Sequence, residues 1–558
     1  MDTPSSDQSI DLNDPYNRTD QIFPTLSPEH IELIKPFGEV QAVESGTMLF
    51  ERGERSVDFF VILEGFVEIY DYAADGTRVI TVHRERQFTG ELDLFNNREI
   101  LVGGKMGANG QVIRISRDQF RKLIAAEPEV YEIIMQAFIL RRRGLISHQQ
   151  ASVTVVAEQQ SSQALRIERF LERNGYPLKV LDFQSEAGQQ LLNRCNVSSE
   201  ELPMVFLHNK EEVLRNPSNL ELAQSLGLVE QIEENHVYDV TVLGAGPAGL
   251  SATVYAASEG LSTLLIEAEA PGGQAGTSSK IENYLGFPLG VSGQGLAGRA
   301  QVQAHKFGAT IALPYSAQGL DCSEQPYRVQ LTDDCAVQTK TVIIATGARY
   351  RKLDVANETK FEGVGIYYAA TAMEGTLCKD EEAIVVGGGN SAGQAAVFLS
   401  RYARHVHVLV RGEGLASSMS NYLIQRIEAS PRITLHPHTE IDTLEGERHL
   451  ERVVWKNNQT GATETQAIKH IFLMLGAVPN TQWLNGCLQL DEKGFILTGR
   501  DVSDGEDWPM ERPRMMMETS VPGVFAAGDV RAGSTKRVAS GVGEGAITVS
   551  QLHQALAE

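Results

Sequence analysis

Residues Tyr238–Gly260 read YDVTVLGAGPAGLSATVYAASEG, which is an apolar strand pattern, a glycine-rich turn and a helix pattern in succession. Gly244, Gly246 and Gly249 give the spacing GxGxxG. These glycines permit a tight turn, a close backbone approach to a pyrophosphate and packing of the helix on the strand. The N–H groups at the start of the helix can then bind phosphate. The stretch predicts a βαβ unit in an α/β fold.

A second strand pattern, LSTLLIE, follows this helix and ends at Glu267, 18 residues beyond Gly249. In a βαβ unit this position lies where a carboxylate can accept hydrogen bonds from a ribose hydroxyl pair. A GxGxxG spacing alone is weak evidence, but strand, loop, helix, strand and acid occur here in the required order. We therefore predict that this segment binds a dinucleotide.

A second glycine loop repeats the arrangement at residues 381–412, EEAIVVGGGNSAGQAAVFLSRYARHVHVLVRG. Where the first unit has Glu267, this one has Val410-Arg411. An acid at this place would repel a 2′-phosphate, whereas an arginine can pair with it. The second unit is therefore predicted to prefer NADPH over NADH, with a structural arginine at a strand end as the alternative.

The chain has 558 residues and a formal net charge of −23, which suits three or four domains. The acidic surplus argues against a nucleic-acid binder, because such proteins contact phosphates with Lys and Arg. The compact basic run Arg141-Arg142-Arg143 is interpreted as a solvated helix end. The polar N-terminus does not resemble a signal peptide, and no stretch reaches membrane-spanning length. We expect a soluble cytoplasmic protein.

Cysteine and histidine spacing predicts no metal site. The five cysteines are scattered without a CxxC, so neither a zinc site nor a disulfide framework follows. Two histidine pairs, His405/His407 and His436/His438, lack a third Cys, His or Asp at ligand spacing. We interpret these histidines as structural.

Patterns that precede Tyr238 indicate two further domains. Residues 1–20 are polar and are expected to form a disordered tail. Short apolar strands separated by Gly and Asp turns, from about residue 40 to residue 115, predict a small β-barrel or sandwich closed by helices. Strand and helix patterns then alternate from SVTVVA to about residue 230, as in a small α/β sheet.

From Tyr238 onward the sequence resembles the low-molecular-weight thioredoxin reductases of the pyridine nucleotide–disulfide oxidoreductase superfamily. The shared landmarks occur in the family's order. They are GAGPAG at 244–249, GGQ at 272–274, IENYLGFP at 281–288, IIATGA at 343–348, GGGNSA at 387–392, LGAVPNT at 475–481 and VFAAGDV at 524–530. The resemblance implies an FAD-binding domain in two pieces, 237–350 and 480–558, and an NADPH-binding domain at 351–479.

The same resemblance implies which residues bind the two cofactors. The FAD site would comprise the first glycine loop, its acid and residues near the flavin, namely Gly244, Ala245, Gly246, Pro247, Ala248, Glu267, Gly273, Gln274, Asn283, Thr346, Gly347, Gly528, Asp529, Arg537, Val538 and Ala539. The NADPH site would comprise Gly387, Gly389, Asn390, Ser391, Ala392 and Arg411. Here the sequence departs from the family. One of two adjacent arginines is missing beside Arg411, and Ala416 stands at the place of a later arginine.

The redox CxxC of the family is also missing. In the family it lies just before the second glycine loop, where this chain reads Gly365 to Ala372, GIYYAATA. Both cysteine positions are alanines, Ala369 and Ala372. Alanine has no thiolate to attack a disulfide or a flavin, so dithiol relay to thioredoxin is not expected. Cys378, six residues after Ala372, is interpreted as a buried small residue.

The leading hypothesis is an enzyme in which NADPH reduces FAD and the flavin passes its electrons to an unknown acceptor other than a dithiol. No side chain is assigned a catalytic role. One alternative is a ferredoxin–NADP reductase of thioredoxin-reductase-like type, although the chain ends at QLHQALAE, where such enzymes extend further. Another is a flavin-bearing regulatory protein with little turnover. The family resemblance also implies a homodimer.

Two weaker resemblances complete the fold prediction, which is an α/β multidomain protein. Residues 24–148 resemble a jelly-roll cyclic-nucleotide-binding domain, in which Glu91 would bind a ribose hydroxyl and Arg98 the cyclic phosphate. The alternative is a degenerate domain kept for dimerisation or partner contact. Residues 152–230 resemble a thioredoxin or glutaredoxin fold without its CxxC, with Pro203 at the place of the family's cis-proline.

Overall fold

A computed structural model describes residues 14–558 except for short gaps. The gaps are 56, 74–75, 91–93, 95–97, 151–152, 159–160, 196–200, 208–211, 231, 234–235, 279–280, 282–283, 289, 354, 362–363, 369, 371, 417–418, 485 and 504–507. The chain divides into two compact units. The first comprises residues 1–158 and 167–230, and the second comprises 159–166 and 231–558. The two units are described separately below.

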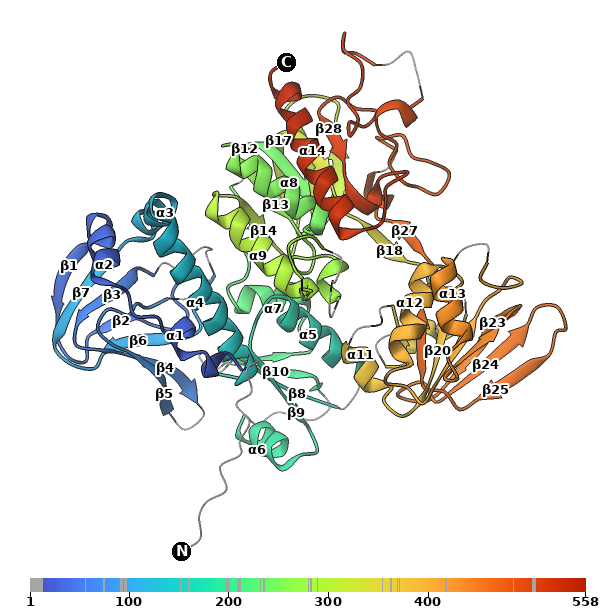
Figure 1. Ribbon diagram of the computed structural model, residues 1–558, viewed down its shortest axis with the longest axis horizontal. Coiled ribbons are helices and arrows are strands. Elements are labelled where there is room, and N and C mark those ends of the chain that lie inside the picture. The colour runs from blue at the N-terminus through green and yellow to red at the C-terminus, as the bar shows by residue number, and fades with distance from the viewer. Residues whose placement is uncertain are drawn as a thin grey trace, which may run out of the picture. The chain divides into compact units, whose positions relative to one another are not determined.

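The first unit begins with a β domain made of two antiparallel sheets, of order β1-β7-β3 and β2-β6-β4-β5 (Figure 1). Its strands are β1 (Glu39–Val43), β2 (Met48–Phe50), β3 (Phe59–Glu64), β4 (Val67–Ala73), β5 (Gly76–His83), β6 (Gly103–Met106) and β7 (Gly110–Ile115). Helices α2 (Pro28–Ile34), α3 (Arg117–Ala126) and α4 (Pro128–Ser147) accompany them. Alternating apolar side chains form the core of the domain. The predicted small β domain is confirmed.

The prediction of a disordered tail is wrong for residues 14–20, whereas residues 1–13 lie outside the described part. A 3-10 helix at Pro15–Asn17 and helix α1 (Thr19–Ile22) occupy this stretch. The Tyr16 hydroxyl donates a hydrogen bond to Gln150 Oε1 at 2.7 Å, and its ring stacks on Phe23. The composition of this stretch is polar, but Tyr16 and Phe23 pack against each other. The apolar area that such rings bury stabilises an ordered conformation.

The interpretation of Arg141-Arg142-Arg143 as a solvated helix end is also wrong. Arg141 and Arg142 are 7% and 8% exposed, and only Arg143 faces solvent. Arg141 Nε donates to the Ile22 carbonyl at 3.0 Å, and its guanidinium carbon lies 4.7 Å from the centre of the Phe88 ring. Helix α4 buries many of its side chains, including two of the three arginines. Three consecutive charges on such a helix are therefore not all exposed to solvent.

A mixed sheet of order β11-β10-β8-β9 follows in the first unit, in which β8 and β9 are parallel and the other pairs antiparallel. The strands are β8 (Val153–Ala157), β9 (Leu178–Asp182), β10 (Met204–Leu207) and β11 (Glu212–Arg215), and the helices are α5 (Ser162–Arg173), α6 (Glu186–Arg194) and α7 (Asn219–Ser225). The predicted alternation is confirmed, except that β11 was not expected. The peptide bond between Leu202 and Pro203 is cis, as the resemblance implied.

The second unit contains two lobes, the first built on a mixed sheet and the second on a parallel sheet, each with helices. The first lobe has the order β14-β13-β12-β17-β16-β15, with β28 beside β17. Its elements are β12 (Val237–Leu243), α8 (Pro247–Ser258), β13 (Thr263–Ile266), α9 (Gly293–Lys306), β14 (Thr310–Ala312), β15 (Ala317–Asp321), β16 (Tyr327–Leu331), β17 (Ala336–Ile344), β28 (Val524–Ala526) and α14 (Val538–Leu556). Helices α8 and α14 lie side by side (Figure 1).

The second lobe has a parallel sheet of order β19-β26-β20-β21-β22 and an antiparallel sheet of order β23-β24-β25. Its strands are β19 (Ile366–Tyr367), β20 (Glu382–Val386), β21 (His405–Leu409), β22 (Ile433–His436), β23 (Thr439–Glu445), β24 (Arg452–Asn457), β25 (Thr463–Gln466) and β26 (His470–Leu473), and its helices are α10 (Glu358–Phe361), α11 (Ala372–Leu377), α12 (Asn390–Leu399) and α13 (Asn421–Glu428). An antiparallel pair, β18 (Ala348–Tyr350) and β27 (Ala477–Pro479), lies where the chain enters and leaves this lobe.

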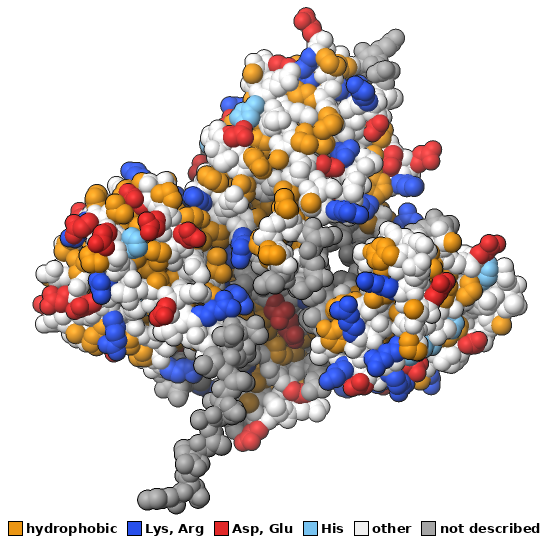
Figure 2. Space-filling view, in the orientation of Figure 1, with side chains coloured by type: hydrophobic (Ala, Val, Ile, Leu, Met, Phe, Trp, Pro, Cys, Tyr) orange, Lys and Arg blue, Asp and Glu red, His pale blue; other side chains and the backbone are white. Residues whose placement is uncertain are grey.

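On the face shown in Figure 2, basic and acidic side chains are interspersed, so the acidic surplus is not gathered there in one patch. In the part of the chain that the structure describes, no helix combines the length and apolar character needed to cross a membrane. The fold class predicted from the sequence is confirmed, whereas the proposed domain boundaries stay predictions.

Candidate cofactor site

At two positions of the first glycine loop only glycine fits. Gly244 has a φ of +102°, and a Cβ there would lie 2.4 Å from the Ala345 carbonyl oxygen. A Cβ on Gly249 would lie 1.8 Å from the Gly244 carbonyl oxygen. At Gly246, by contrast, an added Cβ would meet no atom within 4 Å. The loop is therefore closely packed on its inner side and open in front of Gly246.

The open space lies before the N-terminus of helix α8. Gly246 is the N-cap residue, and no side chain caps the helix. The first N–H groups of a helix lack partners within it and, with the helix dipole, favour an anion. An open cradle in front of free N–H groups fits a pyrophosphate, which is the group that the sequence pattern predicted for this place.

Glu267 lies at the end of β13 and is held against the loop. Its Oε2 accepts a hydrogen bond from the Ala245 N–H at 2.7 Å, and its Oε1 accepts one from the Glu269 N–H at 2.9 Å. The predicted acid and the predicted loop are thus in direct contact. Because each carboxylate oxygen can accept more than one hydrogen bond, Glu267 keeps capacity for a ribose hydroxyl.

Two further predicted segments meet the start of helix α8. Ala248, Ala345 and Ala527 pack together, which brings the stretches before Thr346 and Gly528 to the glycine loop. The Thr346 hydroxyl donates to the Asn480 carbonyl at 2.9 Å, and Asn480 Nδ2 donates back to the Thr346 carbonyl at 2.8 Å. Gly347 follows with a φ of +66°.

Asp529 is the half-buried carboxylate of this region. Burial raises the pKa of its side chain, and among the described residues no donor is bonded to its carboxylate oxygens. A half-buried acid without a donor is costly by itself. The arrangement fits a bound group that brings hydroxyls, as the family resemblance implied for the flavin ribitol.

Sequence reasoning missed the residues that hold Asp529 in place. Glu544, 9% exposed on helix α14, accepts the Gly528 N–H at 2.7 Å and a two-pronged ion pair from Arg531. A lone acid in the small, apolar run GVGEGAITV was the signal available. Helix α14 also approaches α8 closely, because a Cβ on Gly545 would lie 2.3 Å from the Ala248 carbonyl oxygen.

The remaining predicted residues of this lobe are placed as follows. Gly273 has a φ of +54° and lies near Gly246, with an added Cβ 3.0 Å from the Gly246 Cα. The Gln274 amide donates to the Ala348 carbonyl. Asn283 lies outside the described residues. At the start of α14, Arg537 is the N-cap, and Val538 and Ala539 form the first turn.

The second glycine loop repeats the geometry of the first. Gly387 has a φ of +140°, and a Cβ there would lie 2.4 Å from the Met474 carbonyl oxygen. Gly389 caps helix α12 without a side-chain bond. Asn390 Oδ1 accepts the Ser420 N–H at 2.7 Å. Ser391 is exposed and Ala392 is buried. These features fit a second dinucleotide.

Arg411 is exposed two residues after β21, and no described group pairs with its guanidinium. The alternative of a structural arginine therefore receives no support from a contact. The nearby histidines do meet partners. His407 Nδ1 lies 3.0 Å from His436 Nε2, and His407 Nε2 lies 3.3 Å from Glu382 Oε2. Among the described residues no group of His, Cys, Asp and Glu could hold a metal ion.

Comparisons with known proteins agree with this geometry. The family model described as pyridine nucleotide-disulphide oxidoreductase matches residues 238–545. The chain belongs to the pyridine nucleotide-disulphide oxidoreductase family. A second family model, described as cyclic nucleotide-binding domain, matches residues 40–127.

Several relatives of this oxidoreductase family member are named thioredoxin reductases. The chain is 32% identical over 357 residues to NADPH-dependent thioredoxin reductase 3 of Arabidopsis thaliana, which covers 61% of the chain and 64% of the relative. It is 34% identical over 310 residues to the thioredoxin reductase of Treponema pallidum, at 56% and 94% coverage. The crystal structure of Lactococcus lactis thioredoxin reductase (FR conformation) matches with a TM-score of 0.50 and 29% identity, over 57% of the chain and 99% of that protein.

The second unit is thus an oxidoreductase of thioredoxin-reductase type, and family membership brings FAD and NADPH as the family's cofactors. The dithiol of such reductases has no counterpart in the sequence. Ala369 lies outside the described residues, and α11 begins at Ala372. Cys378 is buried, as predicted, and burial raises the pKa of its thiol to about 11.

The structure of this family member also pairs two cysteines that the sequence left 165 residues apart. Cys322, after β15, and Cys487 both pack on the core of the first lobe. A hydrogen bond between the two thiols raises the pKa of Cys322 and lowers that of Cys487. Sequence motifs such as CxxC require two cysteines that are close in the chain, so the sequence did not predict this pair.

The candidate cyclic-nucleotide residues are not brought together in the described part. Glu91 lies outside it. Arg98 is 8% exposed, and its Nη1 donates to the Asn174 carbonyl at 3.2 Å, toward the small α/β sheet. Arg98 does not line the cavity found in the β domain. A phosphate role for Arg98 stays a prediction.

Proposed function

We propose that the chain binds FAD on its first lobe and NADPH on its second, and that it passes electrons from NADPH to an acceptor other than a dithiol. The open cradle at Gly246 carries this proposal, together with the absence of cysteines at Ala369 and Ala372. Bound FAD would supply the two-electron chemistry, because this chain has no cysteine pair at the place of the family's redox dithiol. No acid or base from the chain is required for that step.

The chain's own residues would position the cofactors. Helix α8 directs free N–H groups to a pyrophosphate, and Glu267 and Asp529 provide carboxylates for sugar-type hydroxyls. Arg531 and Glu544 hold the Asp529 segment on α14. In the second lobe, Arg411 would provide the positive charge that pairs with the 2′-phosphate of NADPH.

The experiment is an anaerobic titration of the purified full chain with NADPH and, separately, NADH, following the flavin absorbance. We expect NADPH to bleach the flavin and NADH to do so only at higher concentration. Electron delivery is then measured with ferricyanide, with a quinone and with a thioredoxin-coupled disulfide assay. Turnover with the first two and none with the disulfide supports the proposal.

Two outcomes would overturn it. Disulfide reduction as fast as ferricyanide reduction would mean that other groups replace the missing dithiol. A flavin-loaded protein that neither nicotinamide nucleotide reduces would support a regulatory protein instead of an enzyme. The variant Cys322→Ser/Cys487→Ser distinguishes a genuine disulfide reductase activity of that thiol pair from contamination.

A further inference from the structure

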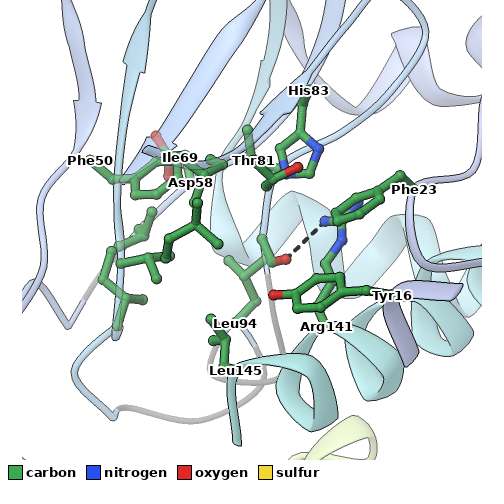
Figure 3. A pocket seen from close by; sticks show the side chains of 16 residues that line it. Tyr16, Phe23, Phe50, Asp58, Ile69, Thr81, His83, Leu94, Arg141 and Leu145 are labelled. Carbon is green, nitrogen blue, oxygen red and sulfur yellow. Dashed lines mark hydrogen bonds between the residues drawn. The ribbon is translucent and has the colours of Figure 1, made fainter. Parts of the chain in front are cut away.

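Two features of the molecule lie apart from the glycine loops and play no part in the proposed cofactor binding. One is the cavity of the β domain, whose wall includes Phe50, His83 and Arg141 (Figure 3). Its volume is about 60 Å³. An engineered cavity that takes up benzene has about 150 Å³, so this one has no room for a ligand of that size. The other feature is the contact between Cys322 and Cys487, which has the chemistry of two neighbouring thiols.

The two cysteines come from segments that the fold places side by side in the first lobe. Cys322 directly follows β15, and Cys487 lies three residues after the 3-10 helix Gln482–Leu484. Strand β15 and this helix are neighbours, and both cysteines pack on the same core. The Cys487 N–H donates to the Leu484 carbonyl at 3.0 Å, which holds the cysteine close to the helix.

The thiols of Cys322 and Cys487 are hydrogen-bonded to each other, and neither belongs to a disulfide. Both side chains are half-buried, but their chain neighbours Asp321, Ser323 and Gly486 are exposed. The pair thus lies at the edge of the core, where a small oxidant can reach it from solvent. Since the two sulfurs are already in contact, a bond between them requires movement of the side chains and not a rearrangement of the sheet.

The hydrogen bond makes the two thiols unequal. Cys322 donates it, so the bond raises the pKa of Cys322 and lowers that of Cys487. Burial and the charge of Asp321 also raise the pKa of Cys322. The thiolate is the reactive form of cysteine. Cys487 is therefore the sulfur that attacks an oxidant, and Cys322 keeps its hydrogen until a second step.

Cys335 is the third cysteine on this core, but it lies at the other end of the β15–β16 hairpin. Cys322 follows Asp321, the last residue of β15. Cys335 accepts the Leu331 N–H at 2.8 Å, and Leu331 is opposite Ala317, the first residue of β15. The five residues of β15, at about 3.4 Å each, separate the two cysteines. In the folded protein Cys335 cannot replace Cys487 as the partner of Cys322.

We propose that Cys322 and Cys487 form a reversible disulfide when the protein meets a hydroperoxide. The Cys487 thiolate attacks hydrogen peroxide, the O–O bond breaks, and Cys487 becomes a sulfenic acid. The hydroxide that leaves takes up the proton that Cys487 gave off. The Cys322 sulfur then attacks the sulfenic sulfur, the S–O bond breaks, and the hydroxyl group leaves with the Cys322 proton as water. The two sulfurs lose two electrons, which reduce one peroxide to two molecules of water.

A dithiol reverses the reaction by thiol–disulfide exchange. Neither FAD nor NADPH takes part in forming or breaking the bond. The inference therefore does not rest on the proposed function, and each can be tested when the other fails.

The test is a disulfide map of the full chain after treatment with hydrogen peroxide. Free thiols are blocked with iodoacetamide, the protein is digested without reductant, and linked peptides are identified by mass spectrometry. We expect two peptides joined through Cys322 and Cys487, and dithiothreitol should separate them. A native protein without this linkage, or with a linkage through Cys335 instead, overturns the proposal.

Oxidation of the same protein in urea is the matched control. Cys322 and Cys335 are 13 residues apart, whereas Cys322 and Cys487 are 165 residues apart. In an unfolded chain the shorter loop closes at a smaller entropic cost, so Cys322 should pair with Cys335 faster than with Cys487. If the native and the unfolded protein give the same linkages, the fold does not direct the pairing and the proposal is wrong.

Two variants test the roles of the sulfurs. Cys322→Ser keeps a hydroxyl donor for the Cys487 thiolate and removes the second sulfur, so peroxide should leave a sulfenic acid on Cys487 that dimedone labels. Equal dimedone labelling of Cys487 in the unmodified protein would mean that Cys322 does not react with the sulfenic acid, against the proposal. Cys335→Ser should form the disulfide at an unchanged rate. The linkages of the unmodified protein decide the matter even if a variant fails to fold.

Discussion

Arg411 has an exposed guanidinium at the end of β21, in the position where the first lobe carries Glu267. Replacing it by glutamate puts a negative charge beside the predicted 2′-phosphate. We expect Arg411→Glu to raise the Kd for NADPH by about 10- to 100-fold, the equivalent of one charge-assisted hydrogen bond. The Kd for NADH should change little, because NADH has no 2′-phosphate.

Flavin bleaching under anaerobic conditions gives both constants. Arg401→Glu is the matched control, since Arg401 is an exposed arginine of the same lobe with no described partner. If Arg411→Glu raises the Kd for NADPH and for NADH equally, or if Arg401→Glu has the same effect, Arg411 does not recognise the 2′-phosphate.

The thiol pair allows a second prediction at this scale. Because the hydrogen bond from Cys322 lowers the pKa of Cys487, the Cys487 thiolate forms at lower pH than that of an ordinary cysteine. Iodoacetamide should therefore modify Cys487 before Cys322, whose pKa the same hydrogen bond raises, and before Cys378, whose pKa burial raises to about 11. Cys487→Ser should accelerate labelling of Cys322. Peptide mass spectrometry over time and pH measures the order, and faster labelling of Cys378 than of Cys487 would contradict it.

At the scale of elements, one position of the first glycine loop can be substituted to test cofactor binding without disturbing the fold. Gly246 has a φ of −71°, which any residue adopts, and an added methyl group would touch nothing within 4 Å. Gly246→Ala should therefore fold normally and place its methyl group where the pyrophosphate is expected. The purified variant should contain at least tenfold less flavin, with an unchanged melting temperature of the cofactor-free protein.

Gly298→Ala is the control for this prediction. Gly298 lies inside helix α9 with no atom near an added Cβ, so alanine should keep the flavin and stabilise the helix by about 0.5–1 kcal/mol. Flavin content is read from the absorbance spectrum after gel filtration. Full flavin content in Gly246→Ala would mean that no ligand occupies the space in front of the loop.

Elements of this kind were predictable from the sequence because the spacing of glycines along the chain marks them. Gly249 leaves room for the Gly244 carbonyl oxygen five residues earlier, and positive φ values favour glycine at Gly244 and Gly387, although the carbonyls that a Cβ would meet there belong to Ala345 and Met474. The burial of Arg141 and the contact of Cys322 with Cys487 depend on segments far apart in the chain. No periodicity or spacing encodes such contacts, which is why the cavity and the thiol pair emerged only from the structure.

At the scale of the whole molecule, two buried arginines join the β domain to the small α/β sheet within the first unit. Arg142 Nη1 donates to the Gly175 carbonyl at 3.2 Å, and Arg98 Nη1 donates to the Asn174 carbonyl at 3.2 Å. Both carbonyls follow the last turn of α5, where acceptors lack helical partners and the dipole favours a cation. The two parts of the first unit should therefore unfold together.

The tryptophans make this testable, since Trp455, Trp483 and Trp508 all belong to the second unit. Arg142→Met leaves the partly buried Gly175 carbonyl without its donor, at a cost of about 1–3 kcal/mol. The melting temperature by circular dichroism should fall by about 2–10 °C in the transition of the first unit. The transition followed by tryptophan fluorescence should stay in place, because it reports the other unit. Arg143→Met, which alters the exposed neighbour, should move neither transition. A shift of both probes in Arg142→Met would mean that the two units unfold as one.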